Sequence, residues 1–428
     1  MSVSIQSLMN HTTLESKTAE EAQQIIMQAV SRAEVQLVKR EMARGSIVAK
    51  TEYAPSALPR FDRSMMDGFA IRYEDAAGAS AHSPIALQVI EHIPAGHDPR
   101  KVLAAGEAAR IMTGGKLPEG ADAVCRFEHT VEALTGVATT IHVTRPVTFG
   151  ENISWEGEDV SLGAPILCKG KRIGAAEIAV LSALGVAAVS VYRKPVIGIL
   201  ATGSELVHAD TLPEGAQIRD SNTPMLVSLV EEAGAVPRVY SAEQDDLAAI
   251  ANVIRQASME TDAIITTGGV SVGDFDLMPA VYEVLQAEQR ITKVRMRPGA
   301  PFRFSIYEET PLFGLSGNVA AGFVNFQLFV APAIRYMAGH ERYANQVTVA
   351  TVSEGFVRRT APADRYLRGT VIMKDGRLHI HIPAAQSSGM IGSFIGANAL
   401  LRLPAHSCLE TGDTAEVVIY GPVEYLPL

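Results

Sequence analysis

Acidic residues and glycines recur wherever a predicted strand ends between residues 195 and 320. The set comprises Gly203, Glu205, Asp220, Ser221, Asn222, Asp245, Asp246, Gly268, Gly269, Asp274, Asp276, Gly317 and Asn318. Ligands of open parallel sheets bind outside the carboxyl ends of the strands, where glycines let backbone amides approach an anion and helix N-termini attract phosphate. Several carboxylates would repel a phosphate unless a hard cation lies between them, and Mg²⁺ is usually held by one or two carboxylates together with substrate phosphates. The pattern therefore predicts a metal-assisted phosphate or pyrophosphate site.

Each member of this set also has an ordinary structural interpretation. A single aspartate after a strand is more often a helix cap than a ligand, and a Thr-Gly-Gly sequence such as 267–269 is commonly a tight turn. The prediction rests on the same residue types recurring at successive strand ends.

Three cations alternate with apolar residues in Lys293-Val-Arg295-Met-Arg297. On a strand these side chains share one face, so their repulsion indicates an anion between them, with a solvated edge strand as the alternative. His379 and His381 also share a strand face, but no third metal ligand lies nearby in the sequence. The sequence contains no Ser-His-Asp order, HExxH motif or Walker loop.

A third dense segment is Leu58 to Arg72, LPRFDRSMMDGFAIR. Asp67 precedes Gly68, and this pairing lets a carboxylate project where a backbone or ligand comes close. Taken alone, the segment is equally well explained as a loop before a strand.

The elements that must position these residues change type along the chain. A helix is predicted over 18–43, because Thr18 and Glu21 fit a capping box and apolar residues follow a helical period. Residues 46–153 are typical of short strands, and 175–184 of a helix that ends at Gly185. Strands predicted over 196–201, 236–240, 263–267 and 312–315 alternate with helices, which indicates a doubly wound parallel sheet over about 195–339. Beyond Gly339 the pattern is all-β, with a hairpin turn at Lys374-Asp375-Gly376.

Composition limits the class of protein. The 428 residues carry a net charge of −10 with a pI of about 5.6, which argues against nucleic acid or an anionic membrane as the main partner. The three cysteines, 125, 168 and 408, are widely separated, so a disulfide framework or cysteine-rich zinc site is not expected. No signal peptide is evident, and the apolar stretches 178–192 and 311–337 are interrupted by glycine or polar residues. We therefore expect a soluble, cytoplasmic protein.

An ordered set of motifs resembles the molybdopterin molybdenumtransferases, which include the MoeA proteins and the gephyrin E-domain. The motifs are Leu58 to Arg72, Met112-Thr113-Gly114 with Leu117-Pro118-Glu119-Gly120, Gly157-Glu158-Asp159-Val160, Ala201-Thr202-Gly203-Ser204-Glu205-Leu206, Gly268-Gly269-Val270-Ser271-Val272-Gly273 with Asp276, and Arg297-Pro298-Gly299-Ala300-Pro301. The resemblance covers almost the whole chain.

The resemblance implies an elongated homodimer with four domains in each chain. Residues 1–45 and 154–193 would form a discontinuous mixed domain, 46–153 a β-rich inserted domain, 194–340 the α/β molybdopterin-binding domain and 341–428 a C-terminal β-barrel. The implied reaction is Mg²⁺-dependent insertion of molybdate into adenylylated molybdopterin, with release of AMP, in molybdenum cofactor biosynthesis. The adenylyltransferase of the same pathway is an open candidate partner.

The resemblance also assigns roles to individual residues. Glu205, Asp245 and Asp276 resemble the acids of the α/β domain site and are the expected metal ligands, while Asp67, Thr113 and Asp159 resemble catalytic residues that enter from the partner subunit. Expected substrate contacts are Gly203, Ser204, Asp220, Gly268, Gly269, Ser271, Lys293, Arg297, Pro298, Pro301, Gly317, Asn318 and Ser388, the last favoured over Ser393.

Some positions depart from the family pattern. Ser316 and Val319 replace prolines on either side of Gly-Asn, and Ala300 replaces a frequent lysine, so we expect a looser phosphate-facing loop with less charge. Two other functions remain open: molybdopterin adenylyltransferase, which would not need the first 190 residues, and a non-catalytic gephyrin-like scaffold. The sequence does not distinguish molybdate from tungstate.

Overall fold

The computed structural model describes residues 15–135, 138–242, 246–269, 277–353, 360–383, 386–387 and 389–425. The chain divides into two compact units. Unit 1 comprises Met1–Gln36 with Tyr192–Leu428, and unit 2 comprises Leu37–Val191.

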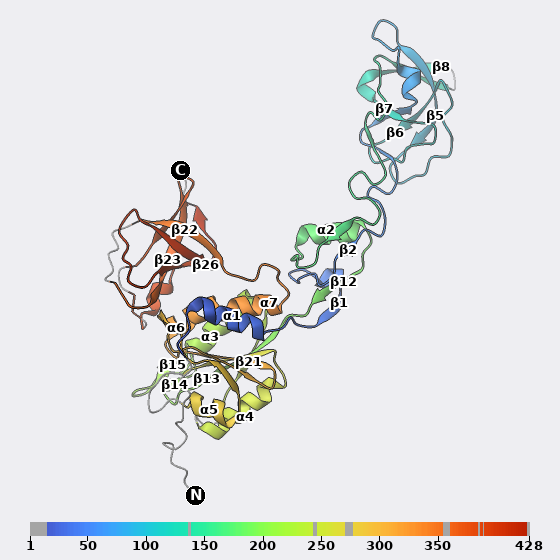
Figure 1. The fold of residues 1–428 in the computed structure, drawn as a ribbon. Helices are drawn as coiled ribbons and strands as arrows, with labels where there is room; N and C mark the ends of the chain where they lie inside the picture. The colour runs from blue at the N-terminus through green and yellow to red at the C-terminus, as the bar shows by residue number, and fades with distance from the viewer. Residues whose placement is uncertain are drawn as a thin grey trace. The chain divides into compact units, whose positions relative to one another are not determined.

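A six-stranded sheet is the centre of unit 1 (Figure 1). Its strands lie in the order β16 (Val236–Tyr240), β13 (Val196–Ala201), β17 (Ala263–Thr267), β21 (Thr310–Leu315), β20 (Arg303–Tyr307) and β18 (Glu288–Ile291). The first four are mutually parallel, and β20 and β18 extend the sheet antiparallel. Every residue of β17 and β21 is buried, as expected for strands covered on both faces.

Helices cover both faces of this sheet, which confirms the predicted doubly wound α/β domain. One face packs against α1 (Ala19–Ala29), α3 (Asn222–Glu232) and the continuous helix formed by α6 (Val319–Asn325), a π-helical segment (Phe326–Val330) and α7 (Ala331–Met337). The opposite face packs against α4 (Leu247–Ser258) and α5 (Met278–Val284) (Figure 1). The helix Val319–Met337 is long and apolar enough to cross a membrane. However, 83% of its apolar 18-residue stretch is buried inside the protein, so it is a core element here.

The C-terminal part of unit 1 is a closed five-stranded barrel, as predicted. β22 (Gln346–Val352), β24 (Arg377–His381), β23 (Asp364–Lys374), β25 (Ala399–Leu403) and β26 (Thr414–Ile419) form a closed ring, with β19 (Met296–Arg297) and β27 (Glu424–Tyr425) added to β23. The predicted hairpin joins β23 to β24, where Lys374 pairs with Arg377. Asp375 and Gly376 both have positive φ, the geometry of a tight two-residue hairpin turn.

The helix predicted over 18–43 is wrong beyond Ala29. Its start is confirmed, because Thr18 Oγ1 accepts a hydrogen bond from the Glu21 amide while Glu21 Oε2 accepts one from the Thr18 amide. Val30 is extended, and β1 (Val35–Lys39) follows and pairs with β12 (Ala188–Tyr192). Pairing with a distant strand and the β-branched Val35 and Val38 outweigh the helical spacing of the apolar residues.

Unit 2 is rich in strands. Its six-stranded sheet has the order β7 (Ala123–Arg126), β4 (Gly68–Ile71), β6 (Glu107–Ile111), β5 (Ile85–Ile93), β9 (Ala138–Val143) and β8 (Thr130–Thr135). Apolar clusters cover it, one around Phe69 and Leu87 and another around Ile93 and Ile111. Short pairs complete the unit: β2 (Glu52–Tyr53) with β11 (Pro165–Leu167), and β3 (Arg63–Ser64) with β10 (Ile153–Ser154). The predicted helix before Gly185 is α2 (Ala175–Ala183).

Candidate functional site

Three loops meet at the carboxyl edge of the sheet in unit 1, where β13, β17 and β21 lie side by side. We call them the strand-end loops: residues 202–205, 268–269 and 316–318. The Thr202 amide donates to the Thr267 carbonyl oxygen at 3.0 Å, and the Gly268 amide donates to Leu315 at 3.3 Å. Segments that are distant in the sequence are therefore fixed against one another at this edge.

Glycine is required where these loops approach closely. A Cβ atom on Gly268 would lie 2.3 Å from the Thr202 carbonyl oxygen, and Gly268 has a φ of +95°. A Cβ atom on Gly317 would lie 3.2 Å from the Gly268 Cα atom. The spacing leaves backbone, rather than side chains, at the surface that a ligand would meet.

Asn222 ties the strand-end loop 316–318 to the end of β17. Its Nδ2 atom donates to Thr267 Oγ1 at 3.1 Å and to the Gly317 carbonyl oxygen at 2.8 Å. Its Oδ1 atom is buried and has no hydrogen-bond partner among the described residues. The sequence placed Asn222 at a strand end, but nothing in the sequence distinguished it from its neighbours as an organising residue.

Ser316 also fixes its loop. Its hydroxyl accepts a hydrogen bond from the Asn318 amide at 3.3 Å, and its carbonyl oxygen accepts one from Thr267 Oγ1 at 3.3 Å. These contacts do not support the expectation that serine, in place of proline, loosens this loop. Asn318 precedes α6, so the first turn of the long helix begins at this edge of the sheet.

The acids near this edge differ in their hydrogen bonding. The carboxylate of Glu205 is exposed and folds over Gly203, such that a Cβ atom on Gly203 would lie 2.7 Å from Glu205 Oε2. Within the described residues, Glu205 has no hydrogen bond or ion pair through its carboxylate. Asp220, by contrast, accepts a hydrogen bond from the Thr223 amide at 3.0 Å and so caps the start of α3. The neighbouring Ser204 is exposed.

Several predicted site residues lie outside the described residues: Asp245, Asp276, Ser271 and Ser388. Ser393, the alternative to Ser388, accepts a hydrogen bond from Arg368 Nε at 2.9 Å and donates to the Met390 carbonyl oxygen at 2.6 Å. In the described part of the chain, no group of three His, Cys, Asp or Glu side chains is placed to hold a metal ion.

The cationic segment is not the continuous strand that the sequence predicted. The Met296 amide donates to the Val294 carbonyl oxygen at 3.0 Å, which turns the chain, and only Met296–Arg297 form a strand. Burial still alternates, so Lys293, Arg295 and Arg297 are all exposed. The predicted alternation of exposed cations with apolar residues is therefore confirmed, although a tight turn replaces part of the predicted strand.

Two of these cations have no carboxylate partner among the described residues. Arg295 lies 3.9 Å from Glu21, whereas Lys293 and Arg297 make no ion pair there. Beyond Arg297, the Val294 amide donates to the Ala300 carbonyl oxygen at 3.0 Å and closes a turn that includes Pro298; Pro301 follows. Lys293 thus lies just before this turn and Arg297 within it, and neither makes an ion pair in the part of the chain that the structure describes.

A separate polar group lies in unit 2. Oδ1 of Asp67, at the start of β4, accepts hydrogen bonds from the Thr113 amide and the Thr113 hydroxyl, both at 2.7 Å. These two bonds, the backbone one first, lower the pKa of Asp67. The predicted pair therefore lies in contact, with the aspartate held as an anion at neutral pH.

Asp159 belongs to the same unit and is held by its backbone. The amides of Asp159 and Val160 donate to the Leu58 carbonyl oxygen at 3.1 and 3.0 Å, so the segment that begins at Leu58 pairs with residues 157–160. The Asp159 side chain is exposed and has no hydrogen bond within the described residues. The segment 58–72 is thus more than a loop before a strand: it links Asp159 to the β4 end that carries Asp67.

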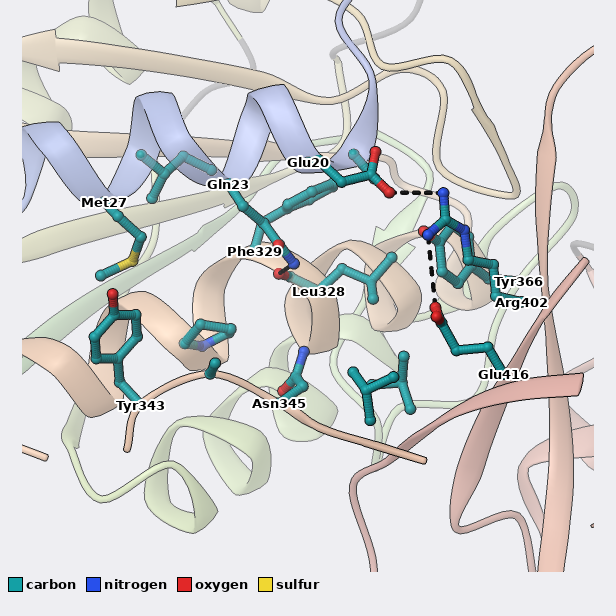
Figure 2. Close-up of a pocket in the computed structure, with 16 residues that line it drawn as sticks. Glu20, Gln23, Met27, Leu328, Phe329, Tyr343, Asn345, Tyr366, Arg402 and Glu416 are labelled. Carbon is teal, nitrogen blue, oxygen red and sulfur yellow. Dashed lines mark hydrogen bonds and ion pairs between the residues drawn. The ribbon is translucent and has the colours of Figure 1, made fainter. Parts of the chain in front are cut away.

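A pocket of about 250 Å³ in unit 1 shares none of its lining residues with the strand-end loops. It lies between α1, the long helix and the barrel (Figure 2). Arg402 at its edge pairs with Glu20 at 2.6 Å and Glu416 at 3.5 Å, and Asp364 contacts the same guanidinium at 2.8 Å. This pocket is therefore separate from the predicted site.

Family models match almost the whole chain. Residues 17–185 match the MoeA N-terminal region (domain I and II), 198–336 match a probable molybdopterin binding domain, and 357–420 match the MoeA C-terminal region (domain IV).

Known proteins agree with these matches. A molybdopterin molybdenumtransferase of Staphylococcus aureus (strain MRSA252) is 38% identical over 383 residues, which are 89% of this chain and 90% of the relative. The same name belongs to a Staphylococcus epidermidis protein (strain ATCC 12228 / FDA PCI 1200) that is 38% identical over 376 residues, 88% of each chain. The crystal structure of a molybdopterin biosynthesis MoeA protein from Pyrococcus horikosii matches with a TM-score of 0.83 and 30% identity, covering 95% of this chain and 100% of that one.

Proposed function

Because the chain belongs to the MoeA family of molybdopterin molybdenumtransferases, we propose that it inserts molybdate into adenylylated molybdopterin and releases AMP. The chain is a transferase of molybdenum cofactor biosynthesis. The proposal concerns the finer chemistry: the adenylylated substrate, the dependence on magnesium and the residues that act.

The observation that carries the proposal is the convergence of the three strand-end loops. The backbone at Gly317 and the first turn of the helix after Asn318 together favour an anionic group such as the pyrophosphate of the substrate, while Gly268, whose amide is bonded to Leu315, keeps side chains away from this surface. Asn222 holds the loop at Gly317 against the end of β17 before substrate binds. Rate enhancement then comes mainly from positioning and electrostatics, without a covalent nucleophile.

The donor set at this edge fits magnesium with few protein ligands. Glu205 offers an exposed carboxylate with no partner in the described residues, and Mg²⁺ usually takes one or two carboxylates with the remaining positions left to water and phosphate. We propose Glu205, Asp245 and Asp276 as the ligands. When bound, magnesium offsets the negative charge of the pyrophosphate and of these carboxylates.

Lys293 and Arg297 are proposed to hold the tetrahedral oxyanion. Both side chains are exposed and lack a carboxylate partner among the described residues. An arginine binds an oxyanion through two parallel N–H groups, whereas a lysine acts as a point charge, so the two supply direction and attraction respectively. With Ala300 uncharged, the cations of residues 293–300 are these two and Arg295, which lies 3.9 Å from Glu21.

We further propose that the protein acts in the cytoplasm as a homodimer with the four domains outlined from the sequence. In that arrangement Asp67, Thr113 and Asp159 of unit 2 complete the site of the partner subunit. The hydrogen-bonded Asp67–Thr113 pair supports this role, because it fixes a negative charge in one position.

Two other functions are less well supported. Adenylylation of molybdopterin alone would not need unit 2, yet residues 17–185 match the N-terminal region of the family. A purely structural scaffold gives no reason for a Glu205 carboxylate, or for cations at 293 and 297, that lack an ion-pair partner among the described residues.

The proposal is tested by incubating the purified protein with adenylylated molybdopterin, Mg²⁺ and molybdate, then measuring AMP and metallated pterin. AMP release that needs both molybdate and Mg²⁺ is expected. A parallel reaction with tungstate addresses the oxyanion. Release of AMP at the same rate without any oxyanion would contradict the insertion step.

A further inference from the structure

Asn325 is a buried asparagine whose side-chain amide is unpaired. The residue is 0% exposed, and neither Nδ2 nor Oδ1 has a hydrogen-bond partner among the described residues. Burial of an unpaired amide disfavours folding, because water is removed without a replacing bond. Because Asn325 lowers the stability of the fold, its presence at this position needs another explanation.

The chain shows elsewhere how it pairs a buried asparagine. In the barrel, Asn398 donates through Nδ2 to the carbonyl oxygens of Val371 and Pro422, at 2.9 and 2.8 Å, and accepts from the Val371 amide at 2.6 Å. Asn398 is therefore a structural bridge between strands. Asn325 has none of these bonds, although it is buried at least as deeply.

The Asn325 amide lies against the turn that carries Arg297. A Cβ atom on Gly299 would lie 2.1 Å from Asn325 Oδ1 and 3.2 Å from Nδ2, so the amide fills the space beside the Gly299 backbone. Gly299 is two residues after Arg297, within the turn closed by the hydrogen bond from Val294 to Ala300. The position of Asn325 thus limits where this turn can lie.

The same helix reaches both halves of the proposed site. It begins directly after Asn318, at the strand-end loops, and Asn325 is the last residue of α6 before the π-helical segment Phe326–Val330. Such segments are frequent at functional sites, because they re-aim neighbouring side chains. One rigid element therefore connects the loop proposed for pyrophosphate with the turn proposed for the oxyanion.

We propose that Asn325 is a positioning residue for the transfer reaction: its amide fixes the turn Arg297–Pro298–Gly299 and so places the Arg297 guanidinium on the oxyanion. This inference rests on the proposed function. Under this inference the Asn325 amide is more than a packing group, because it supports the site although it lowers the stability of the fold.

The test compares Asn325→Leu and Asn325→Ala with Asn398→Leu, in the full-length protein. Steady-state AMP release is measured while molybdate is varied at saturating adenylylated molybdopterin and Mg²⁺, and then while the pterin is varied. Thermal unfolding of each variant is recorded without substrate. Asn325→Ala covers the case in which leucine does not fit.

For Asn325→Leu we expect a Tm equal to or above that of the natural protein, because an unpaired amide is replaced by an apolar group of similar size. The KM for molybdate should rise about tenfold or more, since small displacements of a binding group have large effects, while the KM for the pterin stays unchanged. Asn398→Leu should lower Tm and leave both KM values unaltered.

Unchanged molybdate KM in both Asn325 variants would overturn the inference and leave the proposed function intact. Equal increases in both KM values, or a lowered Tm as the sole effect, would assign Asn325 a general structural role and overturn it as well. No AMP release by the natural protein would contradict the proposed function, and the inference with it.

Discussion

Asp67 in unit 2 and Glu205 in unit 1 are both exposed acids that lie close to a glycine. Only the carboxylate of Asp67 is hydrogen-bonded to described residues of its own unit. Oδ1 of Asp67 accepts two hydrogen bonds from Thr113. Glu205 folds over Gly203 and has no partner through its carboxylate within the described residues. Unit 2 therefore presents a charge fixed in advance, whereas unit 1 presents a carboxylate available to a ligand.

The difference follows from the elements that carry each acid. Asp67 opens a strand whose neighbour β6 ends beside Thr113, so the sheet itself brings donor and acceptor together. Glu205 lies in a loop after β13, and its carboxylate lies over Gly203. Asp67 is thus oriented by strand pairing, whereas the Glu205 carboxylate has no such neighbour among the described residues.

The largest effect is expected for Glu205→Ala. Loss of the available carboxylate should lower the rate of AMP release by about 10²-fold or more, as for removal of one preorganised electrostatic group. Thermal unfolding should be unaffected, because the side chain makes no contact in the described residues that stabilises the fold. Glu214→Ala, an exposed acid nearby, is the control and should retain the natural rate.

A similar loss of activity is expected for Asp67→Ala, but this loss should be partly reversed when subunits are mixed. If unit 2 completes the partner's site, mixing Asp67→Ala with Glu205→Ala chains creates dimers with one intact site, and part of the activity returns. The mixture is measured after exchange of subunits, with each variant alone as reference. Persistent inactivity of demonstrably mixed dimers would place both acids in the site of a single chain.

A smaller effect is expected for Asn222→Ala. The change removes two hydrogen bonds from a buried amide, which should lower the free energy of unfolding by about 1–3 kcal/mol. Because the loop at Gly317 loses its tie to β17, the KM for adenylylated molybdopterin should also rise. A lower Tm with natural kinetics would show that Asn222 supports the fold alone.

The smallest effect is expected for Thr113→Val. Hydrogen bonds to the ionised form lower the pKa of Asp67, so loss of the hydroxyl should move that pKa back up towards its ordinary value, while the backbone bond remains. The benefit of the anion exists above the ordinary pKa and is lost as pH falls through the lowered one. The acid limb of the pH–rate profile should therefore shift to higher pH in the variant, and a limb that stays in place would exclude Asp67 as its source.

The sequence predicted most elements of the fold, because the patterns that define them are local. β16 and β17 were predicted at their observed bounds, and the Asp375-Gly376 hairpin follows from its turn residues. The helix expected over 18–43 failed beyond Ala29, where pairing of β1 with β12 depends on residues 150 positions away. Local periodicity carries no information about that partner.

The candidate site was predictable by residue type but not by contact. The acids and glycines at strand ends predicted a ligand site at that edge of the sheet, and the cationic segment predicted a bound anion. Asn222 and Asn325 were not recognised as organising residues, because their roles depend on which backbone lies beside them. Gly317 and Gly299 are far from these asparagines in sequence and adjacent in space.

Dependence of AMP release on magnesium tests the central claim most directly. Purified protein is given adenylylated molybdopterin and molybdate, Mg²⁺ is titrated, and AMP and metallated pterin are measured for the natural protein and for Glu205→Ala. The account predicts that AMP and metallated pterin appear together, only with Mg²⁺, and that Glu205→Ala loses both while remaining folded. Full activity without a divalent cation, or in Glu205→Ala, would contradict it.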